Sequence, residues 1–171
     1  MSQIDIQYYK SPVGEIILGS YENRLCLADW RYRKMRSAID QRLQKGLKSQ
    51  YVEQGSEVIE RAISQLDAYF SLERKEFDVP LLMVGTEFQE SVWHGLMQIP
   101  FGKTASYAEL AKMIGNEKAV RAVASANGAN AISILIPCHR IIASDGTLAG
   151  YAGGLPAKKK LLALESGLFS A

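Results

Sequence analysis

Cys138 and His139 are the neighbouring residues best suited to chemistry in this chain. A thiolate is a nucleophile, and a free thiol with a pKa of about 8.5 needs a nearby base to reach that form at neutral pH. The run from Ile132 to Ile142 has the apolar pattern of a buried strand, interrupted by Pro137. Side chains of adjacent strand residues point to opposite faces, but Pro137 favours a turn, in which Cys138 and His139 can interact directly or through water. The pair predicts nucleophilic chemistry at Cys138, with a buried, inert cysteine as the alternative.

Glu165 is the candidate acid that orients His139. It lies in the last turn of a helix that we expect to begin at Pro156 and to end at Gly167. An acid in that turn opposes the helix dipole by about 0.5 kcal/mol, so a partner such as His139 is reasonable, although a solvated surface glutamate is the alternative. Residue types alone leave acyl transfer, redox chemistry and alkyl transfer open.

Metal binding is disfavoured by the spacing of the cysteines and histidines. Cys26, the other cysteine, lies in an apolar run that resembles a strand, and two cysteines do not make a disulfide framework. Cys26, Cys138, His94 and His139 lack the spacing of zinc ligands. We expect no structural metal and no cofactor.

Helices with clear start signals must position these residues. Thr86-x-x-Gln89 and Ser106-x-x-Glu109 fit the capping box, in which two side chains satisfy free backbone donors at a helix start. The second helix ends at Gly115-Asn116, and a third follows from about Glu117 to Ala126. Two short helices with a tight glycine turn are the layout of a helix-turn-helix, whose second helix enters a DNA groove.

The second helix of this motif carries almost only small side chains, with Arg121 as its single long cation. A bare helix surface can approach a groove closely, and Arg121 could enter the base stack. The alternative is close packing of the helix on the core, with Arg121 solvated. The candidate DNA contacts on this helix are Ala119, Arg121, Ser125 and Ala126.

The first half of the chain has an α/β pattern. Apolar alternation predicts a three-stranded antiparallel meander over Ile4 to Trp30, followed by helices at Met35 to Leu47 and Val58 to Phe70, with a loop over Lys45 to Gly55. The second helix carries one apolar stripe, which consists of Val58, Ile59, Ala62, Ile63, Leu66, Tyr69 and Phe70. The pattern becomes helical after Pro80. We expect two domains, residues 1–82 and 86–171.

Composition is typical of a globular protein, with 47% apolar residues in 171. The net charge of +2 arises in residues 86–171 and is too small to indicate nucleic acid by itself. The first residues lack a secretory signal pattern, and no stretch is apolar enough to span a bilayer. We therefore expect a soluble, cytoplasmic protein without membrane contact.

One set of motifs resembles a known family, the O6-alkylguanine-DNA alkyltransferases. The likeness covers essentially residues 86–167, in the order Ser106-Tyr107, Gly115-Asn116, Arg121-Ala-Val123, Asn130, Ile136-Pro-Cys-His-Arg140 and Tyr151-x-Gly-Gly-Leu155. It implies an N-terminal α/β domain of ribonuclease-H-like type, with an antiparallel sheet plus helices. It also implies a mainly α C-terminal domain with a winged-helix-like helix-turn-helix.

The resemblance implies direct DNA repair. An alkyl group would pass from O6-alkylguanine, and from O4-alkylthymine as a further substrate, to Cys138, once per molecule and without a cofactor. The partner would be double-stranded DNA, bound through the minor groove by a monomer, with cooperative binding along DNA as an option. The base must leave the stack, which costs a few kcal/mol.

The resemblance also assigns roles to single residues. His139 would be a base acting through water, held by Glu165, and Arg121 would fill the gap left by the extruded nucleotide. Tyr107 would contact the DNA phosphate and donate to the guanine ring, and Asn130 would tie the turn after the recognition helix to the active-site strand. The substrate pocket is assigned to Trp93, Ile141, Tyr151, Ala152, Gly153 and Lys158.

Two other functions remain open from the residues. A DNA-binding protein that flags damage without catalysis would use the helix-turn-helix and be indifferent to Cys138. A cysteine hydrolase would use Cys138, His139 and Glu165 without dependence on DNA.

Overall fold

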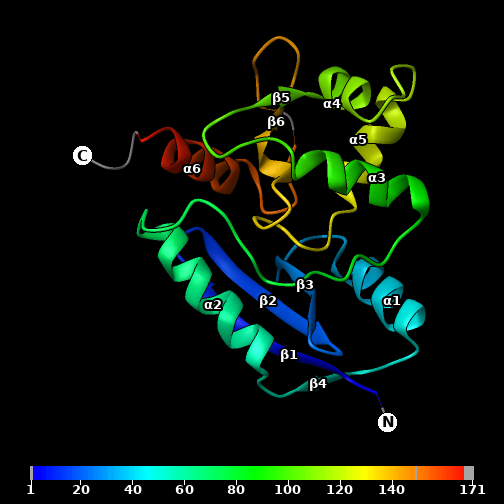
Figure 1. The fold of residues 1–171 in the computed structure, drawn as a ribbon, viewed down its shortest axis with the longest axis vertical. Coiled ribbons are helices and arrows are strands. Elements are labelled where there is room, and N and C mark those ends of the chain that lie inside the picture. Colours follow the sequence, from blue (N-terminus) through cyan, green and yellow to red (C-terminus); the bar gives the residue numbers. More distant parts are fainter. Residues whose placement is uncertain (1, 149, 168–171) are drawn as a thin grey trace. The chain divides into compact units, whose positions relative to one another are not determined.

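The computed structural model describes residues 2–148 and 150–167. The chain divides into two compact units, residues 1–85 and 86–171, and each is described by itself (Figure 1). Within the described ranges no helix is long and apolar enough to cross a membrane.

The first unit is built on a four-stranded sheet. Strands β1 (Ile4–Ser11), β2 (Gly14–Tyr21) and β3 (Arg24–Trp30) form the predicted antiparallel meander. Glu22 and Asn23 link β2 to β3 with φ angles of 47° and 65°. Positive φ at both central residues is the backbone of a type I′ turn, whose twist matches that of the two strands.

The fourth strand, β4 (Tyr51–Glu53), lies in the segment predicted as a loop, so that prediction is wrong. It pairs in parallel with β1 at the sheet edge, giving the order β3-β2-β1-β4. A strand of three residues is too short to display an alternation of its own. Its pairing with β1, from Ile4 opposite Tyr51 to Ile6 opposite Glu53, specifies it instead.

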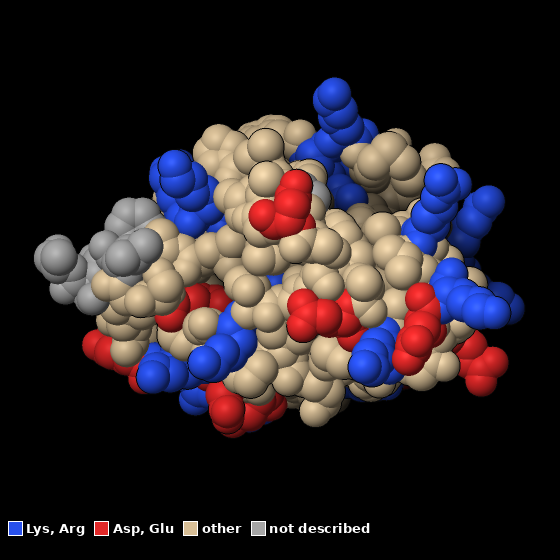
Figure 2. All heavy atoms as spheres, turned by 90° about the horizontal axis from the view of Figure 1, so that it is seen from above, with Lys and Arg blue, Asp and Glu red and all other residues tan. Residues whose placement is uncertain are grey.

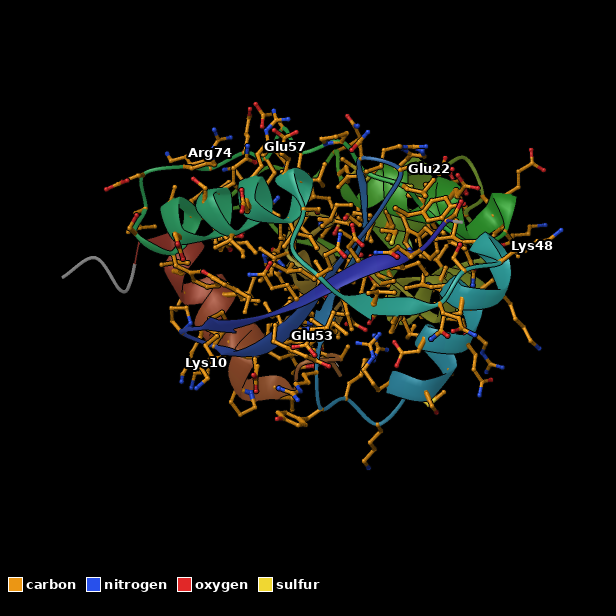
Figure 3. The ribbon with its side chains drawn as sticks, turned by 90° about the horizontal axis from the view of Figure 1, so that it is seen from below. Lys10, Glu22, Lys48, Glu53, Glu57 and Arg74 are labelled. Atoms are coloured by element: carbon orange, nitrogen blue, oxygen red, sulfur yellow. The ribbon has the colours of Figure 1, made fainter. Side chains whose placement is uncertain are left out.

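Two helices complete this unit, α1 (Arg36–Leu47) and α2 (Glu57–Phe70). The Ser56 hydroxyl caps α2 by accepting from the Ile59 N–H at 3.2 Å. The predicted apolar stripe of α2 is buried except for Ile63 and Phe70, which are partly exposed. Figure 1 shows α2 lying along the sheet, and Figure 3 shows Lys10, Glu22 and Glu57 at the periphery of the unit. The predicted class, an antiparallel-dominated sheet with helices, is confirmed.

The second unit is mainly helical. Its helices are α3 (Glu87–Leu96), α4 (Tyr107–Met113), α5 (Val120–Gly128) and α6 (Leu155–Ser166). Strands β5 (Ala105–Ser106) and β6 (Ile141–Ile142) form a short parallel pair. Both predicted capping boxes are present, at the starts of α3 and α4. Gly115, with φ of 76°, lies in the turn between α4 and α5.

Candidate functional site

The segment before Cys138 is buried, but it is not the regular strand that its apolar run predicts. Ser133 pairs with Ile136 in an isolated bridge, and Ile134 has a φ of 72°. Asn130 shapes the segment. Its Nδ2 donates to the Ile136 carbonyl at 2.9 Å, and its Oδ1 accepts from the Ile132 N–H at 2.9 Å. The side chain of Asn130 thus replaces the ladder bonds that a strand would make, which is why the strand prediction is wrong here.

Ile134 holds a strained conformation four residues before Cys138. Left-handed backbone costs a residue with a Cβ about 1–2 kcal/mol, and β-branched residues rarely adopt it. Ile134 is 1% exposed, so its burial in the core opposes relaxation. Strain of this kind persists where the surroundings over-determine it, as they do in functional loops.

Cys138 opens a 3₁₀ helix, Cys138–Arg140, immediately after Pro137. The Cys138 N–H donates to the Ile136 carbonyl at 2.8 Å, and the Arg140 N–H donates to the Pro137 carbonyl at 3.0 Å. The predicted turn at Pro137 therefore exists. It places the thiol of Cys138 on a short helix instead of a strand, with the side chain 4% exposed.

His139 and Glu165 form a buried hydrogen-bonded pair. Nε2 of His139 lies 2.7 Å from Oε2 of Glu165, and the two side chains are 0% and 1% exposed. A carboxylate only accepts, so the imidazole carries its proton on Nε2 and donates it. Nδ1 of His139 is buried and has no hydrogen-bond partner among the described residues. Its lone pair is available to accept a proton.

Arg140 completes the cluster, and the sequence reasoning missed it. Its Nε and Nη2 donate to the two oxygens of Glu165 at 2.8 and 3.0 Å, and its Nη1 donates to the Ile99 carbonyl at 2.7 Å. Forked pairs of this kind fix a carboxylate in orientation as well as position. The position of Arg140 directly after Cys138 and His139 could have indicated its role. If these two residues are buried, the arginine is buried with them and its charge needs an acidic partner.

Electrostatics keep Glu165 charged and His139 neutral. Burial opposes the charged form of Glu165, but the hydrogen bonds from His139 and Arg140, together with the positive charge of Arg140, outweigh it and lower the pKa of Glu165 from 4.5 to about 2. Burial lowers the pKa of His139, Arg140 and Lys158 lower it further, and Glu165 opposes the shift. The site therefore holds an uncharged base against an ionised acid.

Lys158 and Tyr107 are the titratable groups that respond to Cys138. Lys158 lies in α6 and is 0% exposed; burial lowers its pKa, and the thiolate form of Cys138 raises it. Tyr107, the first residue of α4, is partly buried. Burial raises its pKa, Cys138 raises it further, and a hydrogen bond from Asn127 lowers it. A cation and a phenol therefore accompany the thiol, and Asn127 is a contact that the sequence reasoning did not include.

The exposed face of α5 carries some of the residues that were predicted to contact DNA. Arg121, Ala122 and Ser125 are exposed, and Ala119 is partly exposed at the N-cap of the helix. Apart from Arg121, the side chains on this exposed face are small. Such a surface can approach a groove closely.

Two predicted site residues belong to the core of this unit. Ala126 is 2% exposed, and its carbonyl accepts from Nε1 of Trp93 at 2.8 Å. Trp93 itself is 2% exposed, so it supports α5 from α3. Helical spacing explains the misplacement, since Ala126 lies three residues beyond the buried Val123 and shares its face.

The remaining pocket residues flank the 3₁₀ helix and α6. Ile141 follows the 3₁₀ helix, is buried, and starts β6. Tyr151, Ala152 and Gly153 are partly exposed in a turn closed by the Gly154 N–H, which donates to the Tyr151 carbonyl at 2.9 Å. This turn leads directly into α6, which carries Lys158 and Glu165.

Cys26 differs from Cys138 in its surroundings. It is 1% exposed in β3, and burial raises its pKa to about 12. Its thiol stays protonated near neutral pH and lacks nucleophilic character. Among the described residues no group of three His, Cys, Asp or Glu side chains comes together as metal ligands.

Charge on the visible surface is mixed. On the face seen in Figure 2, Lys and Arg side chains stand in separate groups between acidic and uncharged side chains. No continuous basic patch covers that face. A modest net charge of +2 fits this distribution.

Comparison with family models gives two matches along the chain. Residues 5–83 match the ribonuclease-like domain of 6-O-methylguanine DNA methyltransferase, and residues 87–167 match its DNA binding domain. Both predicted parts of the fold class are thereby confirmed.

Known proteins resemble the chain over nearly its full length. The methylated-DNA–protein-cysteine methyltransferase of Methanosarcina acetivorans is 45% identical over 92% of this chain and 95% of the relative. That of Mycobacterium leprae is 43% identical over 91% and 88%. Among solved structures, Mycobacterium tuberculosis O6-methylguanine methyltransferase matches with a TM-score of 0.81 and 37% identity, over 96% of this chain and 94% of that one. A structure of the same organism's protein in complex with DNA matches with a TM-score of 0.81 and 37% identity, over 95% and 93%.

Proposed function

The chain belongs to the 6-O-methylguanine DNA methyltransferase family, and from that premise we propose that Cys138 takes the alkyl group from O6-alkylguanine in DNA. The protein is a methylated-DNA–protein-cysteine methyltransferase, and it binds DNA. The observation that carries the assignment to Cys138 is its position beside the buried pair of His139 and Glu165.

His139 is the base in this proposal. A neutral imidazole with its proton on Nε2 presents the Nδ1 lone pair, and this atom has no hydrogen-bond partner among the described residues. One water molecule between Sγ of Cys138 and Nδ1 of His139 would relay the thiol proton. Glu165 then stabilises the imidazolium that forms, as the acid does in other nucleophile–histidine–acid sites.

The transfer itself is a displacement at carbon. Sγ of Cys138 forms a bond to the alkyl carbon, the bond between that carbon and O6 breaks, and its electron pair stays with guanine. Tyr107 donates a proton to the ring as charge develops there. The thiol proton, now on His139, then passes through solvent to the Tyr107 phenolate, so that both side chains return to their neutral forms. The cationic Lys158 favours the thiolate, consistent with the mutual influence of the two groups.

DNA recognition follows from α5. The alkylated carbon lies inside the duplex, so the nucleotide must be extruded into the site, which costs a few kcal/mol. The small exposed face of α5 suits the minor groove, and Arg121 is the side chain long enough to occupy the vacated stack. Tyr107 lies at the start of α4, where it can reach the adjacent phosphate.

The product is a thioether on Cys138, and no group in the described site returns a thioether to a thiol. Each molecule therefore acts once, and we propose that it does so as a monomer. The test is a titration in which a fixed amount of protein receives increasing amounts of duplex with O6-methylguanine. Methyl uptake should stop at one per chain. Continued demethylation of excess DNA would point to a turnover enzyme, and binding without uptake would point to a damage-flagging protein.

A further inference from the structure

Arg140 is placed to control the charge of the base. Arg140 donates two hydrogen bonds to the Glu165 carboxylate, one to each oxygen, and His139 lies against one of the same oxygens. Its remaining amino group, Nη1, is anchored on the Ile99 carbonyl at 2.7 Å. The Arg140 side chain is 8% exposed, so it has few competing interactions with solvent.

A buried carboxylate beside an imidazole would normally pull a proton onto that imidazole. An opposite charge within about 4–6 Å favours the charged form and shifts a pKa by about 1–3 units. With Glu165 2.7 Å from His139, a resting ion pair would be expected. Such a histidine would already be protonated and could not accept the proton of Cys138.

We propose that Arg140 is a positioning residue that neutralises Glu165, so that His139 rests as an uncharged base with its Nδ1 lone pair free for the thiol proton. The proposal rests on the alkyl-transfer function assigned to Cys138. The negative charge of the Glu165 carboxylate is balanced by Arg140, and the carboxylate accepts a hydrogen bond from His139. It can orient the ring without charging it before the reaction begins.

The other charged and titratable groups around His139 are consistent with a neutral His139. The 3₁₀ helix and α6 pack against each other, and α3 also contacts the 3₁₀ helix. Lys158 in α6 acts on His139 in the same direction as Arg140 and opposes protonation. The charged and titratable groups that face the site come from three elements: Cys138 and Arg140 in the 3₁₀ helix, Lys158 and Glu165 in α6, and Tyr107 in α4. The titratable groups of α3 are Glu87, Glu90 and His94, and none of them is buried.

The first experiment needs no variant. The chain has two histidines, so the ring signals of His139 and His94 can be resolved by NMR of protein labelled with ¹⁵N-histidine. In the wild type, His139 should remain neutral with the Nε2–H tautomer between about pH 5 and 8. Protonation of His139 within that interval would overturn the proposal.

The second experiment replaces the guanidinium. Arg140→Met should raise the pKa of His139 by about 1–3 units, because Glu165 is then left as an uncompensated neighbour. Arg140→Lys keeps a cation but loses the fork, so the pKa should rise less. His94, exposed on α3, is the internal control and should give the same signal in all three proteins.

Activity provides the functional readout. In Arg140→Met, single-turnover methyl transfer should fall about tenfold for each pH unit below the raised pKa of His139, because the neutral fraction falls by that factor. The wild-type rate should show no such fall between about pH 5 and 8. If Arg140→Met does not fold, Arg140→Lys and the wild-type titration still decide the matter.

The outcomes separate this proposal from the function on which it rests. A protein that takes up methyl groups but whose His139 titrates equally in wild type and Arg140→Lys retains the proposed function and loses the role of Arg140. A protein whose His139 behaves as described but that takes up no methyl group retains the electrostatic arrangement and loses the function.

Discussion

Glu165→Gln should destabilise the second unit by removing the charge that holds two buried side chains. The pKa of Glu165 is lowered from 4.5 to about 2, which corresponds to about 3 kcal/mol of folding free energy at neutral pH. The Glu165 side chain is 1% exposed, so solvent screening reduces this figure little. A glutamine would also leave Arg140 buried without its counter-charge, which acts in the same direction.

The pH dependence gives this prediction its sign. When folding lowers the pKa of a carboxyl group, the folded protein binds fewer protons than the unfolded protein at a pH between the two pKa values. Its contribution is therefore complete above a pH of about 4.5 and is lost as the pH falls towards about 2. The wild type should lose about 3 kcal/mol more than Glu165→Gln over that interval.

Urea unfolding followed by tryptophan fluorescence measures the effect. Trp93 is buried in the second unit, and Trp30→Phe in all proteins removes the other tryptophan. Glu117→Gln, at an exposed acid of the same unit, is the matched control and should change stability little. The reasoning is refuted if Glu165→Gln and Glu117→Gln have the same stability at pH 7, or if the wild type and Glu165→Gln lose stability in parallel on acidification.

Three further predictions concern other parts of the site. Asn130→Ala should destabilise the protein by about 1–3 kcal/mol in urea unfolding, because it leaves the Ile132 N–H buried without its partner and removes one hydrogen bond to the Ile136 carbonyl, which keeps its bond from the Cys138 N–H; unchanged stability would mean that the segment holds its shape without Asn130. Iodoacetamide near pH 8 should label Cys138 and leave Cys26 unmodified in peptide mass spectra, since the pKa of Cys26 is raised to about 12, and equal labelling would contradict this contrast. Arg121→Ala should slow repair of duplex DNA more than transfer from free O6-methylguanine, because extrusion is needed only in the duplex. Equal slowing of both reactions would remove the proposed role of Arg121 in extrusion.

Features encoded by neighbouring residues were predictable from the sequence. The capping boxes at Thr86 and Ser106 need only residues three apart, and both are present as predicted. The stripe of α2 repeats over fourteen residues and buries the face expected from its period. The meander follows from alternation and from the positive-φ turn at Glu22 and Asn23.

Features that depend on tertiary contacts were predicted poorly. The strand β4 exists because β1 offers it an edge, and residues 132–136 leave the strand conformation because Asn130 takes over their hydrogen bonds. Neither cause is visible within the segment concerned. Ala126 was predicted as a DNA contact on a helix of small residues, but small residues serve packing and groove approach equally, and its burial shows that it packs in the core.

The chemical residues divide in the same way. Cys138 and His139 could be identified from their types and from Pro137, and Glu165 from its unfavourable place in a helix. Arg140 could not be assigned, because its partner lies 25 residues away on α6 and its anchor is a backbone carbonyl before α4. Identity of the substrate rests on the family, since residue chemistry alone left three reaction types open.

Mass spectrometry of the protein after reaction with duplex DNA containing O6-methylguanine tests the central claim most directly. The wild type should gain the mass of one methylene, and fragmentation should locate the added methyl group on Cys138. A Cys138→Ala variant that still binds the duplex should gain nothing. A methyl group on another residue, or wild-type protein that demethylates excess DNA while remaining unmodified, would contradict the account.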